Sequence, residues 1–373
     1  MDGVASGSHL AAIAERFALG GDLGSIEAMG NGNVNDTYLV RVLGTPDRRF
    51  VLQRLNTLVF PKPERLMANI HALGEHVERR LAAGDGLKAD HRWEVPRLIP
   101  VRQGPHPWVE DPAGHIWRMI TFIDDARSFE TVEDDAQARE LGYGLGTFHS
   151  LVSDLPIERL AETLEGFHIT PTYLEAYRET LAATTALPEP ELAFCQAFVA
   201  ARSDRAGVLE EAKGRGVLRL RPIHGDPKVN NVMMDLRSGR AVGLVDLDTV
   251  QPGLIHYDIG DCCRSGCNPL GEETQDWRAV HFDLGRCEAI LAGYLAAARS
   301  FLTGDDIAYL YDAIQLIAFE LGLRFLTDHL KGNVYFKVRH PRHNLERALV
   351  QFRLSESIEE QEGAIRAVIE RLR

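Results

Sequence analysis

The densest polar segment of the chain is Arg221-Pro-Ile-His-Gly-Asp-Pro-Lys-Val-Asn-Asn-Val-Met-Met-Asp235, and Gly243-Leu-Val-Asp-Leu-Asp-Thr249 follows it shortly. The first segment has the form His224-x-Asp226-x4-Asn231 and leads into a short apolar strand over 232–234. The second segment is another apolar strand, and it ends at Asp246. A hairpin between these strands would place Asp226, Asn231 and Asp246 at one loop edge.

Phosphoryl transfer is the chemistry that needs this set of groups. It requires a carboxylate to orient and deprotonate the attacking hydroxyl, and oxygen ligands for Mg²⁺. It also requires positive charge near the transferred phosphoryl group. We therefore assign Asp226 as the base, Asn231 and Asp246 as metal ligands, and Lys228 as the cation that faces the phosphate.

The pattern resembles the signature HxDxxxxN of the aminoglycoside phosphotransferase and choline kinase family, in which a metal-binding Asp follows on the next strand. The resemblance implies an α+β, bilobal, protein-kinase-like fold, with ATP and Mg²⁺ as cofactors. His224 stands at the first signature position, and its ring is expected to bond to the loop backbone, with a direct catalytic role as the alternative. Asp248 is expected either to bind a second Mg²⁺ or to support the site. Asp258 and Asp261, ahead of an expected helix, are interpreted as caps or braces for the loop.

The pattern of apolar residues divides the chain into a β-rich first third and a helix-rich remainder. Strands are expected at 37–42 and 50–55, separated by a turn at 44–47, and strand-like runs recur over 93–124. A helix at 8–19 precedes these strands, and another begins at Pro63. Further helices are expected at 132–151, 171–183, 190–212, 276–300, 305–330 and 356–371. We place the lobes at 1–124 and 125–373, with the active site in the cleft between them.

The N-terminal lobe is expected to bind the nucleotide. The segment from Gly30 to Tyr38 resembles the family's nucleotide-covering loop, although the third glycine of GxGxxG is missing. Kinase-like folds carry a lysine on the third strand, where this chain has Gln53, so the anchor for the nucleotide phosphates stays open, as does its acidic partner. The nucleotide-binding residues that we predict are Gly30, Gly32, Asn33, Gln53, Thr121 and Ile123, the last two in the segment that joins the lobes.

A narrower resemblance concerns the acceptor. The segments 35–38, 51–56, 245–249, 324–328 and 334–337 are similar to those of bacterial N-acetylhexosamine 1-kinases, which phosphorylate the anomeric hydroxyl of GlcNAc or GalNAc. The resemblance implies sugar contacts for Asp36, Arg324 and Tyr335. The alternatives are a strand-end cap for Asp36, a helix-face salt bridge for Arg324 and packing between helices for Tyr335.

Other functions stay open at this stage. One is a kinase for an aminoglycoside or an amino alcohol, which would need an acidic pocket. Another is a non-catalytic nucleotide-binding protein, which the glutamine at position 53 alone favours. A metal-dependent hydrolase is poorly motivated, and a P-loop kinase is excluded because the chain contains no Walker A motif.

The composition sets limits on partners and location. A formal net charge of −13 disfavours nucleic acid as a partner, and 45% hydrophobic residues suffice for a sizeable core. No apolar run is long enough to cross a membrane, and the first residues lack the pattern of a signal peptide, so we expect a cytoplasmic enzyme. The five cysteines are interpreted as reduced, buried thiols rather than a metal site. The oligomeric state stays open.

Overall fold

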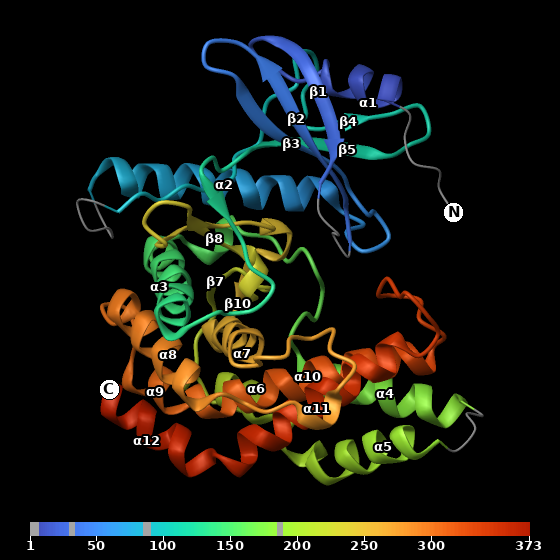
Figure 1. The fold of residues 1–373 in the computed structure, drawn as a ribbon, viewed down its shortest axis with the longest axis vertical. Helices are drawn as coiled ribbons and strands as arrows, with labels where there is room; N and C mark the ends of the chain where they lie inside the picture. Colours follow the sequence, from blue (N-terminus) through green and yellow to red (C-terminus); the bar gives the residue numbers. More distant parts are fainter. Residues whose placement is uncertain (1–6, 30–33, 85–90, 185–188) are drawn as a thin grey trace.

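A five-stranded antiparallel sheet forms the N-terminal region of the computed structural model, which describes residues 7–29, 34–84, 91–184 and 189–373 (Figure 1). Its strand order is β1-β2-β3-β5-β4. The strands are β1 (Asp22–Ala28), β2 (Asp36–Leu43), β3 (Arg48–Arg54), β4 (Val109–Glu110) and β5 (Ile116–Thr121). The hairpin expected around 44–47 is confirmed, since β2 pairs with β3 in antiparallel register. Only β4 and β5 come from the stretch 93–124, so most of that stretch is not strand.

One face of this sheet is buried because its side chains alternate. Tyr38, Val40 and Val42 on β2 point into a small core that also contains residues of α1 (Gly7–Ala14). The helix expected at 8–19 therefore ends early, and Phe17 instead forms an isolated bridge with Val101.

Helix α2 (Pro63–Ala82) begins at the expected proline and lies between the sheet and the helical region (Figure 1). Its apolar face, which includes Leu66, Ile70 and Leu73, belongs to the larger core of the C-terminal helices. The division at 124/125 stays a prediction, because α2 precedes it in sequence but packs into the core that follows it.

The C-terminal region is mainly helical, as expected. Its helices are α3 (Asp135–Val152), α4 (Thr170–Ala183), α5 (Pro190–Arg202), α6 (Val208–Gly214), α7 (Ile255–Gly266), α8 (Leu284–Ala298), α9 (Gly304–Ala308), α10 (Leu310–Leu330), α11 (His343–Glu360) and α12 (Glu362–Leu372). Single turns of 3-10 helix lie at Ile157–Arg159, Ser203–Arg205, Val229–Asn231, Leu247–Thr249 and Trp277–Ala279. Short strands complete it, namely β6 (Ala126–Arg127), β7 (Arg221–Ile223), β8 (Val232–Asp235), β9 (Ala241–Leu244) and β10 (Gln251–Gly253).

Several helix boundaries that we predicted are wrong for local reasons. The helix expected at 190–212 breaks into α5 and α6 around Ser203 and Gly207. Helix α8 begins only after Asp283, whose side chain caps it by accepting a hydrogen bond from the Arg286 backbone N–H. Helix α11 was not predicted, because polar side chains such as Asn344 and Arg347 share its buried face and hide the apolar period.

Two glycines let α3 and α8 approach closely. A Cβ added at Gly142 on α3 would lie 1.9 Å from the Ile290 carbonyl oxygen, and one at Gly293 on α8 would lie 1.9 Å from the Arg139 carbonyl oxygen. Both obstacles are backbone atoms of the facing helix, so neither can turn away. Helices α3 and α8 are therefore packed by backbone-to-backbone contact at these positions.

No described helix is long and apolar enough to span a bilayer.

We expect Gly142→Ala to destabilise the protein by about 1–3 kcal/mol, because the added methyl group forces α3 and α8 apart. The measurement is the midpoint of urea unfolding followed by circular dichroism. The control is Gly74→Ala in α2, where the nearest atom to an added Cβ is Arg97 Cγ at 3.8 Å. That change should be neutral or stabilise by about 0.5–1 kcal/mol, since alanine favours a helix. Equal midpoints for the two variants would contradict the close approach.

Candidate active site

Two small antiparallel strand pairs build the edge at which the predicted groups meet. Strand β8 pairs with β9 so that Val232 opposes Leu244, and the Val245 N–H donates to the Asn231 carbonyl at 2.9 Å. Asn231, just before β8, and Asp246, just after β9, are therefore neighbours. Strand β10 pairs with β7, which fixes the start of the loop over residues 224–231. We call this segment the 224–231 loop.

A buried carboxylate on α7 holds the start of this loop. Asp258 accepts hydrogen bonds from the backbone N–H of His224 at 2.7 Å and of Gly225 at 2.8 Å. It also bonds to His149 Nε2 at 2.9 Å. Although burial raises the pKa of Asp258, these hydrogen bonds, led by that from His149, outweigh it and lower the pKa overall. The expected brace is present, although Asp258 and Asp261 lie within α7 rather than ahead of a helix.

Gly225 has a positive φ of 89° in this turn. A Cβ there would lie 2.7 Å from the Thr249 carbonyl oxygen, so glycine is required on both conformational and steric grounds.

The His224 ring bonds to the backbone, as expected. Its Nε2 lies 3.0 Å from the Val245 carbonyl, and its Nδ1 accepts from the Asp226 N–H at 3.3 Å. The first contact requires a proton on Nε2 and the second a lone pair on Nδ1, which describes a neutral ring. Burial lowers the pKa of His224 in agreement with this form.

Asp226 lies at the centre of the polar groups that we predicted. Its Oδ2 forms an ion pair with Lys228 Nζ at 3.0 Å and accepts from Asn231 Nδ2 at 3.2 Å. Burial would lower the pKa of Lys228, but the Asp226 and Asp246 carboxylates outweigh it, so the pKa is raised and the lysine is charged. Because Asn231 uses its amide nitrogen on Asp226, its side-chain oxygen is the atom left to coordinate a metal.

Asp246 lies between β9 and the 3-10 turn Leu247–Thr249. It has a left-handed backbone conformation, with φ of 64°, and its residue is exposed. Surrounding protein atoms, then the charges of Asp248 and Asp226, raise its pKa to about 7. A carboxylate that neighbouring carboxylates make costly to ionise gains most from a cation, so Asp246 and the Asn231 oxygen suit a hard ion such as Mg²⁺.

Asp248, unlike Asp246, is paired with side chains of the N-terminal region. It is buried, with its Oδ1 2.5 Å from Arg118 Nη2 and its Oδ2 accepting from Asn35 Nδ2 at 2.7 Å. Both oxygens therefore have protein partners from the N-terminal sheet region. Of the alternatives considered for Asp248, this geometry favours support of the site over a second metal.

Arg118 is a buried residue that the sequence reasoning missed. It opposes Gln53 in the β3–β5 register and donates to Gln53 Oε1 from Nε at 2.9 Å and from Nη2 at 2.7 Å. Its Nη1 is buried and has no hydrogen-bond partner among the described residues. The guanidinium thus supplies positive charge beside Gln53, at the strand position where kinase-like folds carry a lysine. An arginine within the apolar segment 116–121 was the available signal.

The structure gives no direct evidence on the other residues that we predicted to contact the nucleotide. Gly30, Gly32 and Asn33 lie outside the described residues. Thr121 ends β5 and exchanges hydrogen bonds with Arg97, while Ile123 is buried. Their role in binding adenine stays a prediction.

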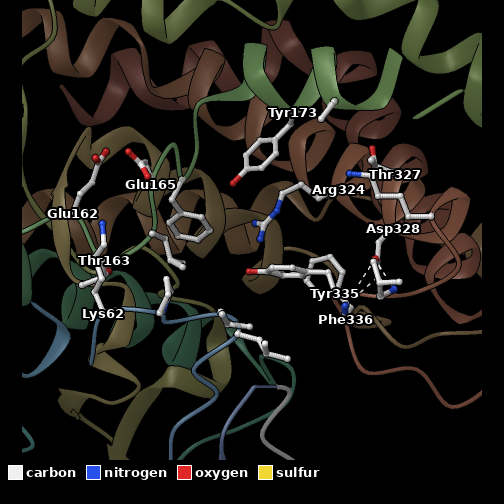
Figure 2. A pocket seen from close by; sticks show the side chains of 18 of the residues that line it. Lys62, Glu162, Thr163, Glu165, Tyr173, Arg324, Thr327, Asp328, Tyr335 and Phe336 are labelled. Carbon is white, nitrogen blue, oxygen red and sulfur yellow. Dashed lines mark hydrogen bonds between the residues drawn. The ribbon is translucent and has the colours of Figure 1, made fainter. Parts of the chain in front are cut away.

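A cavity of about 540 Å³ adjoins this site (Figure 2). Arg324 and Tyr335, two of the predicted acceptor contacts, both line it, and their contact with an acceptor stays a prediction. Asp36 is not among its lining residues. It forms an ion pair with Arg54 Nη2 at 2.5 Å and lies 3.9 Å from Lys337 Nζ, in the segment that carries Tyr335.

A second missed residue, His168, connects the cavity to the 224–231 loop. Its Nε2 lies 2.7 Å from the Gly225 carbonyl oxygen, and its Nδ1 lies 2.8 Å from Glu320 Oε1. Because both partners are acceptors, both ring nitrogens donate. The pKa of His168 is raised in agreement, since Glu320 outweighs the lowering effect of burial. Phe167, its neighbour, lines the cavity. His168 thus links Glu320 on α10 to the backbone next to Asp226, directly beside a residue that lines the cavity.

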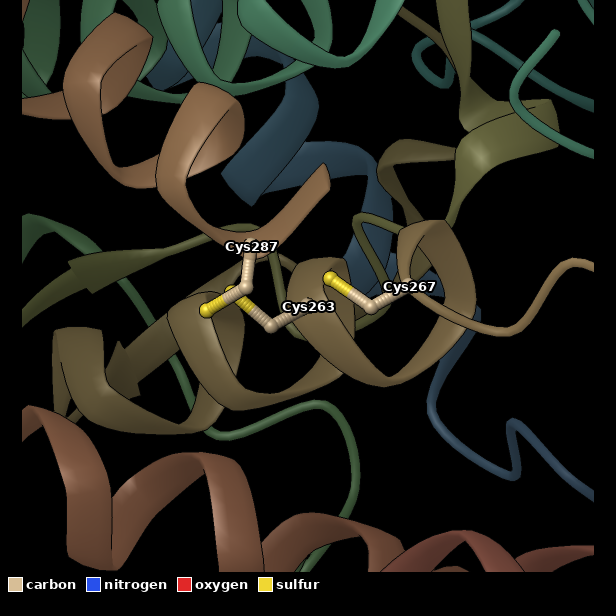
Figure 3. Close-up of side chains that lie close together, drawn as sticks. All are labelled: Cys263, Cys267 and Cys287. Carbon is tan, nitrogen blue, oxygen red and sulfur yellow. The ribbon is translucent and has the colours of Figure 1, made fainter. Parts of the chain in front are cut away.

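The cysteines lie apart from these groups. All five are free and buried, which confirms the prediction of buried thiols. The sulfur atoms of Cys263, Cys267 and Cys287 lie within 4.8 Å of one another, between α7 and α8 (Figure 3). Cys287, from a distant part of the chain, could not be grouped with the others by spacing.

Comparison with known proteins agrees with this geometry. Residues 25–299 match the model of the phosphotransferase enzyme family, and the chain belongs to that family of small-molecule phosphotransferases. An aminoglycoside phosphotransferase from Alicyclobacillus acidocaldarius aligns over 100% of this chain and 98% of its own, with 13% identity and a TM-score of 0.63.

Other solved structures support the fold. A microcompartment-associated aminopropanol kinase shares 17% identity with a TM-score of 0.62, over 96% of this chain and 98% of its own. Choline kinase from Cryptosporidium parvum shares 14% identity with a TM-score of 0.54, over 92% and 91%. The predicted bilobal kinase-like fold, with its β-rich and helical regions, is confirmed.

For Asp246 as the predicted metal ligand, the raised pKa should make Mg²⁺ binding depend on pH. Below pH 7 a proton competes with the metal, so the apparent Mg²⁺ affinity should be about tenfold weaker at pH 6 than at pH 8. Without metal, the folded protein holds a proton that the unfolded chain releases between about pH 4 and pH 7, so its stability should fall as pH rises through that window.

The measurement is the Mg²⁺ dependence of the thermal midpoint at both pH values. Asp246→Asn should weaken the Mg²⁺ effect and abolish its pH dependence. Asp204→Asn, at an exposed position in the 3-10 turn Ser203–Arg205, is the matched control and should change neither. An unaltered Mg²⁺ titration in Asp246→Asn would remove Asp246 from the metal site.

Proposed function

We propose that the chain is an ATP- and Mg²⁺-dependent kinase that phosphorylates a sugar hydroxyl, namely the anomeric hydroxyl of an N-acetylhexosamine. The observation that carries this proposal is the convergence of Asp226, Lys228, Asn231 and Asp246 at one loop edge beside a cavity. An amicoumacin kinase with 15% identity and a TM-score of 0.55 was solved with AMP-PNP, Ca²⁺ and its ligand, which supports the choice of nucleotide and divalent ion.

Each residue has a defined task in this scheme. Asp226 accepts the proton of the acceptor hydroxyl and orients its oxygen. Lys228, charged at neutral pH, faces the phosphoryl group. Asn231 and Asp246 would hold Mg²⁺, which neutralises phosphate charge when bound. Arg118 adds positive charge behind the site and is held there by Gln53 and Asp248.

The acceptor assignment draws support from the cavity. Its volume suits a small molecule, and its lining combines rings with polar groups, as a sugar with hydroxyls and apolar faces requires. Arg324 and Tyr335, implied as sugar contacts by the resemblance, both line it. An anomeric hydroxyl is more acidic than an ordinary alcohol, so a carboxylate base is adequate.

The first test is an ADP-release assay with Mg²⁺-ATP and a panel of acceptors. The panel comprises GlcNAc, GalNAc, glucosamine, glucose, galactose, choline and kanamycin, with product positions assigned by ³¹P and ¹H NMR. We expect turnover of the N-acetylhexosamines to 1-phosphates. Turnover of choline or kanamycin alone would refute the acceptor assignment while retaining the kinase. ATP binding without turnover of any acceptor would favour the non-catalytic alternative.

Asp226→Asn should reduce kcat by roughly 10²- to 10⁴-fold, because it removes the proton acceptor. The far-ultraviolet circular dichroism and the binding of a fluorescent ATP analogue should be retained. Asp204→Asn serves again as the control and should keep full turnover. A kcat close to that of the unaltered enzyme in Asp226→Asn would refute the base assignment.

A further inference from the structure

The guanidinium of Arg324 is enclosed by aromatic rings inside the acceptor cavity (Figure 2). Its central carbon lies 5.1 Å from the ring centre of Phe167, 5.2 Å from that of Tyr173 and 5.6 Å from that of Phe336. These distances are in the range of cation–π attraction. Phe167 and Tyr173 come from the start of α4 and the residues before it, and Phe336 comes from the segment after α10, so the fold assembles a cage around one cation.

Acidic groups contribute little to holding Arg324 in place. Within the described residues, no carboxylate oxygen forms an ion pair with its guanidinium. Glu320 lies one turn earlier on α10, but Oε1 of its carboxylate bonds to His168 and Oε2 accepts from Thr170. The rings of Phe167, Tyr173 and Phe336 are therefore the groups in direct contact with the guanidinium, while Glu320 and Asp226 favour its charge from further away.

The surroundings add positive charge to the cavity. Lys62, Arg65 and Lys331 also line it. The acidic side chains of Glu162 and Glu165 lie at exposed positions of the lining. Asp328 is not available to a ligand cation, because its oxygens accept three backbone N–H groups and the Asn344 amide.

An aromatic cage is the arrangement that proteins use to bind quaternary ammonium groups. Here the cage contains a cation of the protein itself. We propose that Arg324 fills an aromatic cage that would otherwise accept a substrate's ammonium group, and thereby restricts this kinase to uncharged, hydroxyl-rich acceptors. The proposal rests on the proposed function for the identity of the acceptor, but the cage itself can be tested without catalysis.

Arg324 has two effects in this account. Its charge repels a cationic acceptor, and its volume occupies the space between the rings. Its N–H groups remain as donors for hydroxyl oxygens, since a guanidinium carries five donors and no acceptor. Arg324 is therefore a specificity-determining residue, and its removal should change which ligands the cavity takes.

The experiment compares tetramethylammonium binding to the unaltered protein and to Arg324→Met, by isothermal titration calorimetry without nucleotide. Methionine removes the charge and the bulk of the guanidinium, so the ring faces become accessible, and it keeps an apolar stem. We expect Arg324→Met to bind tetramethylammonium about tenfold more tightly than the unaltered protein, or better. Choline should follow the same order, whereas its uncharged analogue 3,3-dimethyl-1-butanol should gain far less.

Two controls separate the cage from net charge. Lys331→Met removes a positive charge at an exposed position of the same cavity but leaves Arg324 between the rings, so it should gain less than about twofold. Arg324→Lys keeps a cation at the position and should gain little. An equal gain in Lys331→Met and Arg324→Met would show that only net charge matters, which overturns the proposal.

The unaltered protein alone provides a further decisive result. Tight binding of tetramethylammonium to it would overturn the proposal, because the cage would then be open. If Arg324→Met does not fold, as judged by circular dichroism, Arg324→Gln replaces it with the same expectation. Failure of the proposed function is read separately, from the acceptor panel with the unaltered enzyme, and leaves the binding result intact.

Discussion

The buried carboxylate of Asp258 is the contact on which the rest of the site depends. It binds two consecutive backbone N–H groups at the start of the 224–231 loop and a histidine from α3. A buried acceptor left without these donors would be costly, so the loop, α3 and α7 are fixed together. The close approach of α3 to α8 through glycines then makes this frame rigid. Asp226 directly follows the two backbone N–H groups that Asp258 holds, so the same contacts position it.

The N-terminal sheet is coupled to this frame by an ion pair that crosses between regions. Arg118 on β5 reaches Asp248, two residues after the proposed metal ligand Asp246. Asn35, at the beginning of the N-terminal hairpin, bonds to the same carboxylate. Because Arg118 also bonds to Gln53, one buried guanidinium connects the expected nucleotide strand with the metal-binding edge. A buried pair of this kind is costly to break, so it fixes the relative position of both sets of groups.

The sequence predicted the parts whose chemistry is local. The signature from His224 to Asn231, the strand that delivers Asp246 and the hairpin of β2 and β3 were all legible from spacing and period. It could not predict Arg118 or His168, because their roles arise from partners far away in the chain. Helix α11 was missed because Asn344 and Arg347 are buried through contacts with other segments. The spacing of residues reveals the apolar period of helices and strands, but it does not reveal which polar residues pair over long distances in the chain.

The cavity that we propose for the acceptor is connected to the 224–231 loop through residues of α10 and through His168. Glu320 bonds to His168, which bonds to the Gly225 carbonyl next to Asp226, and Arg324 lies one helical turn from Glu320. The charges of Arg324 and Asp226 therefore interact across a short distance, and the Asp226 carboxylate contributes to raising the pKa of Arg324. A cationic acceptor would add positive charge to a path that already contains a protonated histidine and an arginine. An uncharged acceptor, as in the proposed function, would leave that balance intact.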